Sequence, residues 1–307
     1  MNNIFVAFFT VITMLLYALP GYLLIKSKMI DEGGISNFAK LLMFVCQPVL
    51  VIYSLTVVPF SVEFGLKLLT ALVFMFFIQF GSMFVMYLIF RNKMENVKYR
   101  IYAIACCMGN YAFMGIPVLE AMIPGNPEAV AYTSMASVAL NVSGWTFASF
   151  IISQDKKYIS PKKVFFNPVM LAFYVALPLF LFNIKLPGQL NTVVTTLGRM
   201  TTPLCMLILG MRLATTTFKS VFFNVKQYMP VAVKQILLPF AALMILKLLP
   251  VDHVMRESVY IMLCCPIASV VLNFSELIGQ GQKTASEMVL LGTALSSVTI
   301  PFMMIFA

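Results

Sequence analysis

The stretch 109–117 places a side-chain amide between helix-breaking residues in the middle of an apolar run. Gly109 and Gly115 permit non-helical backbone dihedrals, and Pro117 lacks the amide proton that a continuous helix needs. A helix broken there would leave backbone amide protons free, and the positive end of a helix attracts anions. Together with the side-chain amide of Asn110, the stretch predicts an anion-binding site. The alternative is a proline kink that serves packing alone.

Such a site would need further neutral donors. A helix end contributes about 1–2 kcal/mol to anion binding when partly buried, whereas removing a carboxylate from water costs several kcal/mol. Polar side chains and prolines elsewhere in apolar segments could complete the site, although packing or hydrogen bonding between helices accounts for each of them equally well. These candidates are Gln47, Pro48, Gln79, Ser137, Asn141, Pro266, Asn273 and Thr293.

Ionisable residues inside apolar segments form a second group of candidates. Lys234 lies about two helical turns inside its segment, a depth at which a charge is costly and is a functional hypothesis by default. Its long stem could equally reach toward the lipid headgroups. Arg199 is similarly placed in another segment, whereas Glu120 and Glu276 fall near segment ends and are expected to be solvated.

The sequence shows no pattern of an enzyme, a channel or a metal site. It contains neither HExxH nor Gly-x-Ser-x-Gly, and its one histidine, His253, lies outside the apolar segments. The six cysteines fall within apolar segments without metal-binding spacing, and no cofactor is expected. No ring of charges or repeated filter segment points to a channel. Binding or carriage is therefore favoured over catalysis.

The composition indicates which elements must hold these residues. Of 307 residues, 61% are hydrophobic and 10% are charged, and the mean hydropathy is +0.95, so there is too little polar sequence to cover a soluble domain. We expect an all-α integral membrane protein that crosses the lipid bilayer several times. Ten transmembrane helices are predicted, over 4–25, 36–57, 66–90, 101–123, 129–153, 167–184, 190–212, 227–249, 257–279 and 286–306.

Basic residues decide the orientation of these helices. The net charge of +10 would suggest nucleic acid in a soluble protein, but here the basic residues cluster in alternate loops, so no nucleic-acid partner is expected. The stretch 154–163 carries four lysines. Loops on the other side hold only Lys67, Lys185, Lys247 and Arg256. By the positive-inside rule the loops that are rich in basic residues, such as 154–163, are cytoplasmic, and both termini are extracellular.

Weak internal similarity divides the chain into halves. Pro48 and Pro203 are 155 residues apart, as are Gln79 and Lys234. We expect a first five-helix repeat at 1–153, a cytoplasmic linker at 154–163 and a second repeat at 164–307. Because five is odd, the second repeat must enter the membrane from the opposite face. Inverted repeats with broken helices are typical of secondary transporters, which bind substrate near mid-membrane.

These features resemble the auxin efflux carrier family, which includes bacterial organic-acid permeases and the plant PIN-FORMED auxin transporters. The resembling residues are Asn110-x4-Gly115-x-Pro117, Gln47-Pro48-Val49-Leu50, Asn167-Pro168, Thr202-Pro203-Leu204 with Gly210, and Pro266. The resemblance covers essentially the whole chain. The short loop between the halves fits the bacterial branch of the family, and hence the bacterial cytoplasmic membrane.

The resemblance implies that the fourth and ninth helices cross at unwound midpoints. It also implies a scaffold of helices 1, 2, 6 and 7 that forms a homodimer, and a moving transport domain of helices 3–5 and 8–10. Val271 stands where plant members have a second crossover proline, so the second break is left open. Adaptable packing at the dimer interface is expected from Met43, Cys46, Cys205 and Met206.

The implied function is transport of a small carboxylate, malate- or malonate-like or auxin-like, by elevator-type alternating access. One alternative is a Na⁺- or H⁺-coupled organic-anion symporter with the fold of the bile-acid symporters, which bind sodium through carboxylates and backbone carbonyls. A membrane receptor or sensor is the alternative of a different class, and the lack of a visible soluble output domain argues against it.

Overall fold

The computed structural model describes residues 3–307 and is built almost entirely of helices. Each of the stretches that is long and apolar enough to cross a membrane overlaps one of the helices expected from the sequence. There are eight of them in the described residues: Asn3–Lys26, Gly34–Thr56, Val62–Lys93, Pro127–Ser153, Lys156–Leu181, Gly188–Ala214, Val225–Leu248 and Gln282–Met303. An all-α membrane protein is therefore confirmed.

Most of these stretches combine several helical elements. The first half of the chain forms α1 (Asn3–Leu16), α2 (Ala18–Lys26), α3 (Gly34–Leu41), η1 (Leu42–Cys46), α4 (Gln47–Thr56), α5 (Val62–Phe90), η2 (Arg91–Lys93), α6 (Val97–Ala105), α7 (Gly115–Met122), α8 (Pro127–Ser143), η3 (Gly144–Ala148) and α9 (Ser149–Ser153). The second half forms η4 (Lys156–Tyr158), α10 (Pro161–Phe165), α11 (Pro168–Leu181), α12 (Gly188–Arg199), α13 (Thr201–Ala214), α14 (Phe218–Phe222), η5 (Val225–Gln227), α15 (Tyr228–Ala232), η6 (Val233–Leu237), α16 (Leu238–Leu248), α17 (His253–Cys264), α18 (Val270–Leu277) and α19 (Gln282–Met303). Elements η1, η3 and η6 are π-helical turns within longer helices.

Two pairs of shorter helices are each interrupted by a non-helical segment. Residues 106–114 separate α6 from α7, and residues 265–269 separate α17 from α18. The first break is the one expected around 109–117, and the second settles the question that Val271 left open. Neither half of a pair is long enough to cross a membrane alone. The count of ten spans and the inverted repeats stay predictions.

Prolines explain where the helices change. Pro117 lies in the first turn of α7, where a missing amide proton is harmless, so it helps to start α7 rather than to break a helix at its own position. Pro48 and Pro239 cannot bond the carbonyls four residues earlier, which lie inside the π-helical turns η1 and η6. The π-turns therefore fall where a proline has removed a regular helical bond.

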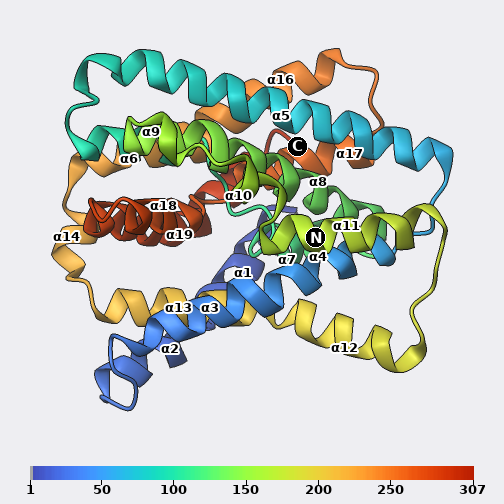
Figure 1. The fold of residues 1–307 in the computed structure, drawn as a ribbon, viewed down its shortest axis with the longest axis horizontal. Helices are drawn as coiled ribbons and strands as arrows, with labels where there is room; N and C mark the ends of the chain where they lie inside the picture. The colour runs from blue at the N-terminus through green and yellow to red at the C-terminus, as the bar shows by residue number, and fades with distance from the viewer. Residues whose placement is uncertain (1–2) are drawn as a thin grey trace.

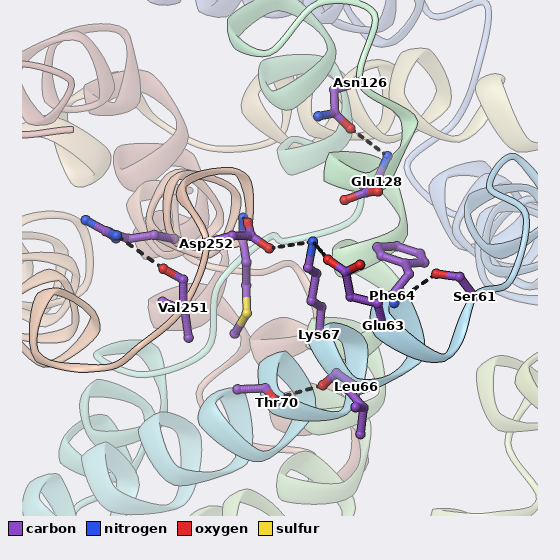
Figure 2. A network of polar contacts seen from close by, with 12 residues as sticks. Ser61, Glu63, Phe64, Leu66, Lys67, Thr70, Asn126, Glu128, Val251 and Asp252 are labelled. Atoms are coloured by element: carbon purple, nitrogen blue, oxygen red, sulfur yellow. Dashed lines mark hydrogen bonds and ion pairs between the residues drawn. The ribbon is translucent and has the colours of Figure 1, made fainter.

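Charged residues tie α5 to the start of α17 (Figure 2). The Nζ of Lys67 lies 3.0 Å from the Glu63 carboxylate and 3.1 Å from that of Asp252. Asp252 also caps α17, because its carboxylate accepts a hydrogen bond of 2.7 Å from the Met255 amide. The Asp252 carboxylate thus both caps the start of α17 and binds a lysine of the neighbouring helix α5.

Figure 1 shows α5 along the upper edge of the molecule, α12 and α13 along the lower edge, and the broken helices between them. Along the lower edge α2 packs against α13 at two glycines. A Cβ added to Gly21 would lie 2.0 Å from the Leu207 carbonyl oxygen, and one added to Gly210 would lie 1.8 Å from that of Ala18. Only glycine allows the two backbones to approach so closely.

Three of the four residues expected at a dimer interface lie inside the protomer. Cys46, Cys205 and Met206 are at most 1% exposed, so they cannot contact a second copy, and this expectation is wrong. Met43 is partly buried, and its sulfur accepts a hydrogen bond of 3.4 Å from the Asn273 side chain. Sulfur-containing residues here fill gaps within one chain.

Candidate functional site

The two breaks pair with each other through their backbones. The Asn110 amide donates to the Pro266 carbonyl at 2.8 Å, and the Ala268 amide donates to the Met108 carbonyl at 3.0 Å. The residues between these bonds form an antiparallel bridge. All four named residues are buried. Because a buried backbone group must find a partner, this pairing is what allows both helices to open side by side.

Lys234 caps the broken end of α17. Its side chain, within η6, is 0% exposed, and its Nζ donates to the carbonyls of Leu263 at 2.6 Å and Cys265 at 3.0 Å. The ammonium also lies 5.5 Å from the centroid of the Tyr111 ring. These carbonyls stand where the helical hydrogen-bond ladder stops. The lysine points into the protein, so the headgroup alternative is wrong.

The phenol of Tyr111 connects the first break to α5. The Gln79 side chain donates to the Tyr111 hydroxyl, which itself donates to the Cys107 carbonyl at 3.3 Å. A Cβ added to Gly109 would lie 2.3 Å from the Tyr111 ring and 2.7 Å from the Lys234 Cε. Gly109 is therefore required so that the phenol and the ammonium can pack against the backbone.

Asn110 is held mainly by its backbone. Besides the bond to Pro266, its carbonyl accepts a hydrogen bond of 3.3 Å from the Gly115 amide. Its side chain is 5% exposed and lies against the Cys205 thiol. A side-chain amide offers two donors and an acceptor, whereas a thiol is a weak partner. The arrangement leaves the Asn110 amide with hydrogen-bonding capacity for a ligand.

Cys205 also lines a cavity of about 40 Å³. The polar wall of the cavity comes from Arg212 on α13, Ser269 and Asn273 at the start of α18, and Ser286 on α19. Because one water needs about 10–15 Å³, the cavity has room for about three waters. Ser269 directly precedes α18, so the N-terminal, positive end of that helix lies at the cavity wall, although the amides of Val271 and Leu272 already bond the carbonyls of Ala268 and Ser269.

A second cavity, of about 10 Å³, lies between α4, α7 and α8. Gln47 and Ser137 line it, together with Ser54 and Ser134, whose hydroxyls are hydrogen-bonded to each other. The structure thus divides the sequence candidates. Asn273 lines the larger cavity, whereas Gln47 and Ser137 line the smaller one.

Three candidate donors bond within their own helices. The side chains of Ser137, Asn141 and Thr293 each donate to the carbonyl four residues earlier, at 2.7, 3.2 and 2.8 Å. Such local bonds satisfy a polar group without a second helix. Pro48 lies in the first turn of α4 and Gly115 opens α7, so both shape helix starts.

Two polar residues beside the breaks were missed by the sequence candidates. Gln235 is 0% exposed, donates to the Gly292 carbonyl at 2.7 Å, and accepts a bond of the same length from a threonine of α19. The Thr202 hydroxyl donates to the Phe113 carbonyl inside the first break at 2.8 Å. The sequence contained a clue to each of them, since Gln235 follows a lysine within an apolar segment and Thr202 precedes a proline.

Two ion pairs join α12 and α13 to the far ends of the broken helices. The Arg199 guanidinium lies 3.4 Å from the Glu120 carboxylate, and that of Arg212 lies 3.2 Å from Glu276. Arg199 also donates to the Tyr53 hydroxyl at 3.1 Å. The glutamates are 39% and 47% exposed, so they are partly solvated as expected, but the arginine partners were not foreseen.

An all-helical membrane protein whose broken helices pair beside a largely apolar cavity with a few polar side chains has the construction of a membrane transporter. A family model described as membrane transport protein matches residues 6–162 and 157–304. The chain therefore belongs to this family, the auxin efflux carrier family, as the sequence resemblance indicated. The comparison with curated proteins found no match. The protein is a multi-pass membrane transporter of the auxin efflux carrier type, and the family is one of transporters rather than enzymes.

Proposed function

We propose that this transporter carries small organic anions, malate- or malonate-like or auxin-like carboxylates, which bind at the paired breaks. Asn110 is the observation that carries the proposal. Its side-chain amide is buried where the two broken helices meet, and it lies against Cys205 in the wall of the larger cavity. Asn110 does not itself line the cavity, so the proposal includes a small movement of the Cys205 side chain that lets a carboxylate accept a hydrogen bond from this amide.

The charges around the breaks favour an anion over a cation. α7 and α18 both start at the breaks, so the positive ends of two helices border the site. Lys234 adds a buried ammonium, and Arg212 stands at the cavity wall. Lys234 already bonds two carbonyls and Arg212 is paired with Glu276, so these groups support a desolvated carboxylate mainly through their positive charge.

The proposed movement is an elevator step of α5–α9 and α15–α19 past a scaffold of α1–α4 and α10–α13. Both cavities lie between these two groups of helices. The larger cavity borders Arg212, on the side that the positive-inside rule assigns to the cytoplasm. The cavities measure about 40 and 10 Å³, so in this state there is more room for a ligand on the cytoplasmic side.

The proposed assembly is a homodimer formed by the outer faces of the scaffold helices. Because Cys46, Cys205 and Met206 are buried within the protomer, the contact would use exposed side chains such as Phe5, Phe9 and Phe44. Native mass spectrometry from nanodiscs should give the mass of two chains. A single-chain mass there would contradict this assembly.

A thermal-shift screen against mono- and dicarboxylates tests the function. A ligand at about a hundred times its dissociation constant stabilises the folded state by roughly 2.7 kcal/mol. We expect Asn110→Ala to abolish this shift. The unliganded variant should keep its stability within about 1–2 kcal/mol, because the change removes a ligand donor and not a core contact.

Asn141→Ala is the matched control. Its side-chain amide already bonds a carbonyl of its own helix, so the carboxylate shift should persist. Unchanged affinity in Asn110→Ala would show that the site is assigned wrongly. If only cations or lipids stabilise the wild type, transport of organic anions is the wrong function.

A further inference from the structure

The ammonium of Lys234 is placed like a bound metal cation. It is completely buried, donates to the Leu263 and Cys265 carbonyls at 2.6 and 3.0 Å, and lies over the Tyr111 ring. Carbonyls of an unwound helix are the groups that hold Na⁺ in transporters with broken helices, and an aromatic face also attracts a cation. Here the cation is attached to the chain.

The surroundings of the ammonium leave its charge only partly balanced. The ionisable side chains around it in the described part of the chain are the phenol of Tyr111 and the thiols of Cys107, Cys264 and Cys265, and none of them is a carboxylate. The C-terminal end of α17 supplies a partial negative charge of about half an elementary charge. An empty site therefore carries excess positive charge, which the charge of one carboxylate can balance.

The lysine is also linked to Asn110 through the paired breaks. It holds the Cys265 carbonyl, and the next residue, Pro266, accepts the hydrogen bond from the Asn110 amide. Removal of the ammonium would free the end of α17 and loosen the segment that places Asn110. Lys234 is thus a positioning residue for the predicted ligand donor.

Only one of two corresponding positions carries this charge. Gln79 lies 155 residues before Lys234 and is equally buried, but it is a neutral amide that donates to the Tyr111 hydroxyl. The side chains around the breaks therefore include one neutral hydrogen-bond donor, the Gln79 amide on α5, and one cation, Lys234, on the segment Val225–Leu248.

We propose that Lys234 acts as a covalently attached cation at the place where a coupling Na⁺ would bind, so that carboxylate binding requires no dissolved Na⁺. The inference rests on the proposed function, because it concerns the same anion site. The ammonium holds the open end of α17 and balances the charge of the carboxylate.

The first test compares carboxylate affinity of the full-length wild type in nanodiscs in Na⁺, K⁺ and choline buffers, by thermal shift. The dissociation constants should agree within about twofold, because the lysine stays in place whatever ion is dissolved. A requirement for Na⁺ overturns this inference and leaves the proposed function intact. No shift with any carboxylate in any of the salts overturns the proposed function, and the inference with it.

The second test uses substitutions of the lysine. In choline, Lys234→Ala should bind the carboxylate roughly tenfold to a hundredfold more weakly, because the balancing charge and the charge-assisted hydrogen bonds to the Leu263 and Cys265 carbonyls are lost. Ethylammonium or Na⁺ should restore binding by filling the vacated space. Lys234→Met fills that space with an uncharged side chain and should bind weakly with or without either ion. Lys247→Ala removes an exposed lysine from the same segment and should bind like the wild type.

These variants separate a cation from a mere space-filler. Wild-type affinity of Lys234→Met in choline would mean that the stem alone matters, and would overturn the inference. Wild-type affinity of Lys234→Ala without added amine would overturn it as well. If Lys234→Ala does not fold, Lys234→Met and the wild-type salt series still decide the question.

Discussion

Tyr111 shows how one hydroxyl supports the paired breaks. It accepts a bond from Gln79 and donates to the Cys107 carbonyl, while the Gln79 Oε1 is buried without a partner in the described residues. Tyr111→Phe keeps the ring but leaves the Gln79 amide with no hydroxyl acceptor. We expect a loss of about 1–3 kcal/mol in the free energy of unfolding, the typical cost of an unsatisfied buried group. Thermal unfolding in detergent measures it.

Tyr174→Phe is the control for this prediction. Tyr174 is 42% exposed on α11, so the loss of its hydroxyl should leave the unfolding midpoint unchanged. Equal midpoints for the two variants would contradict the bond assigned to Tyr111.

Some of the site residues could be found from the sequence, and others could not. Gly109 and Asn110 stand out because a membrane helix tolerates glycines and an amide in its apolar run only where protein or a cavity receives the freed polar groups. The direction of Lys234 could not be deduced, since the same charge pattern fits a lysine that reaches the headgroups. Its carbonyl partners lie 29 and 31 residues away, on a helix whose break had to be known first.

At the scale of elements, the contact between α2 and α13 depends on two glycines. The Cβ of Gly210→Ala would lie 1.8 Å from the Ala18 carbonyl oxygen, which is backbone and cannot move aside as a side chain would. We expect the free energy of unfolding to fall by about 1–3 kcal/mol, as for other overpacked contacts. The midpoint of thermal unfolding and the monodispersity of the purified protein report the change.

Gly188→Ala provides the comparison for Gly210→Ala. Gly188 opens α12, and an added Cβ there meets nothing within 4 Å. It should therefore leave the unfolding midpoint unchanged. If Gly210→Ala behaves in the same way, the two helices are farther apart than described.

The position of the second break follows from the local sequence alone. A residue before proline is biased toward extended dihedrals, and Cys265, before Pro266, has φ −60° and ψ 148°. This pair alone stops α17, so no second proline is needed at Val271. The pairing of the two breaks is different in kind. It joins residues from opposite halves of the chain, and no local pattern in the sequence specifies it.

At the scale of the whole molecule, the ion pairs are compatible with movement between the two groups of helices. Arg199–Glu120 and Arg212–Glu276 each connect a scaffold helix to a broken helix, and all four side chains are partly exposed. Exposed pairs of this kind typically contribute only about 0.2–1 kcal/mol. By contrast, the Lys67 cluster joins α5 to α17 within the proposed moving group (Figure 2). The pairs can thus open while the moving group stays intact.

The unequal cavities predict unequal access from the two sides of the membrane. Asn273→Cys in the larger cavity should react readily with a membrane-impermeant maleimide added on the cytoplasmic side. Ser137→Cys in the smaller cavity should react slowly from the outside, because a volume of about 10 Å³ barely admits one water. All six native cysteines are buried, but Cys205 lines the larger cavity, so the labelling variants are made in a Cys205→Ser background.

Exposed positions calibrate this labelling. Lys28→Cys should react only from the cytoplasmic side and Lys185→Cys only from the outside, as the positive-inside rule assigns them. A saturating carboxylate should slow the labelling of Asn273→Cys by occupying the cavity that Asn273 lines. Reversed labelling of Lys28→Cys and Lys185→Cys would contradict the orientation. Faster labelling of Ser137→Cys than of Asn273→Cys, with the two calibration variants behaving as expected, would instead mean that the transporter rests open to the outside.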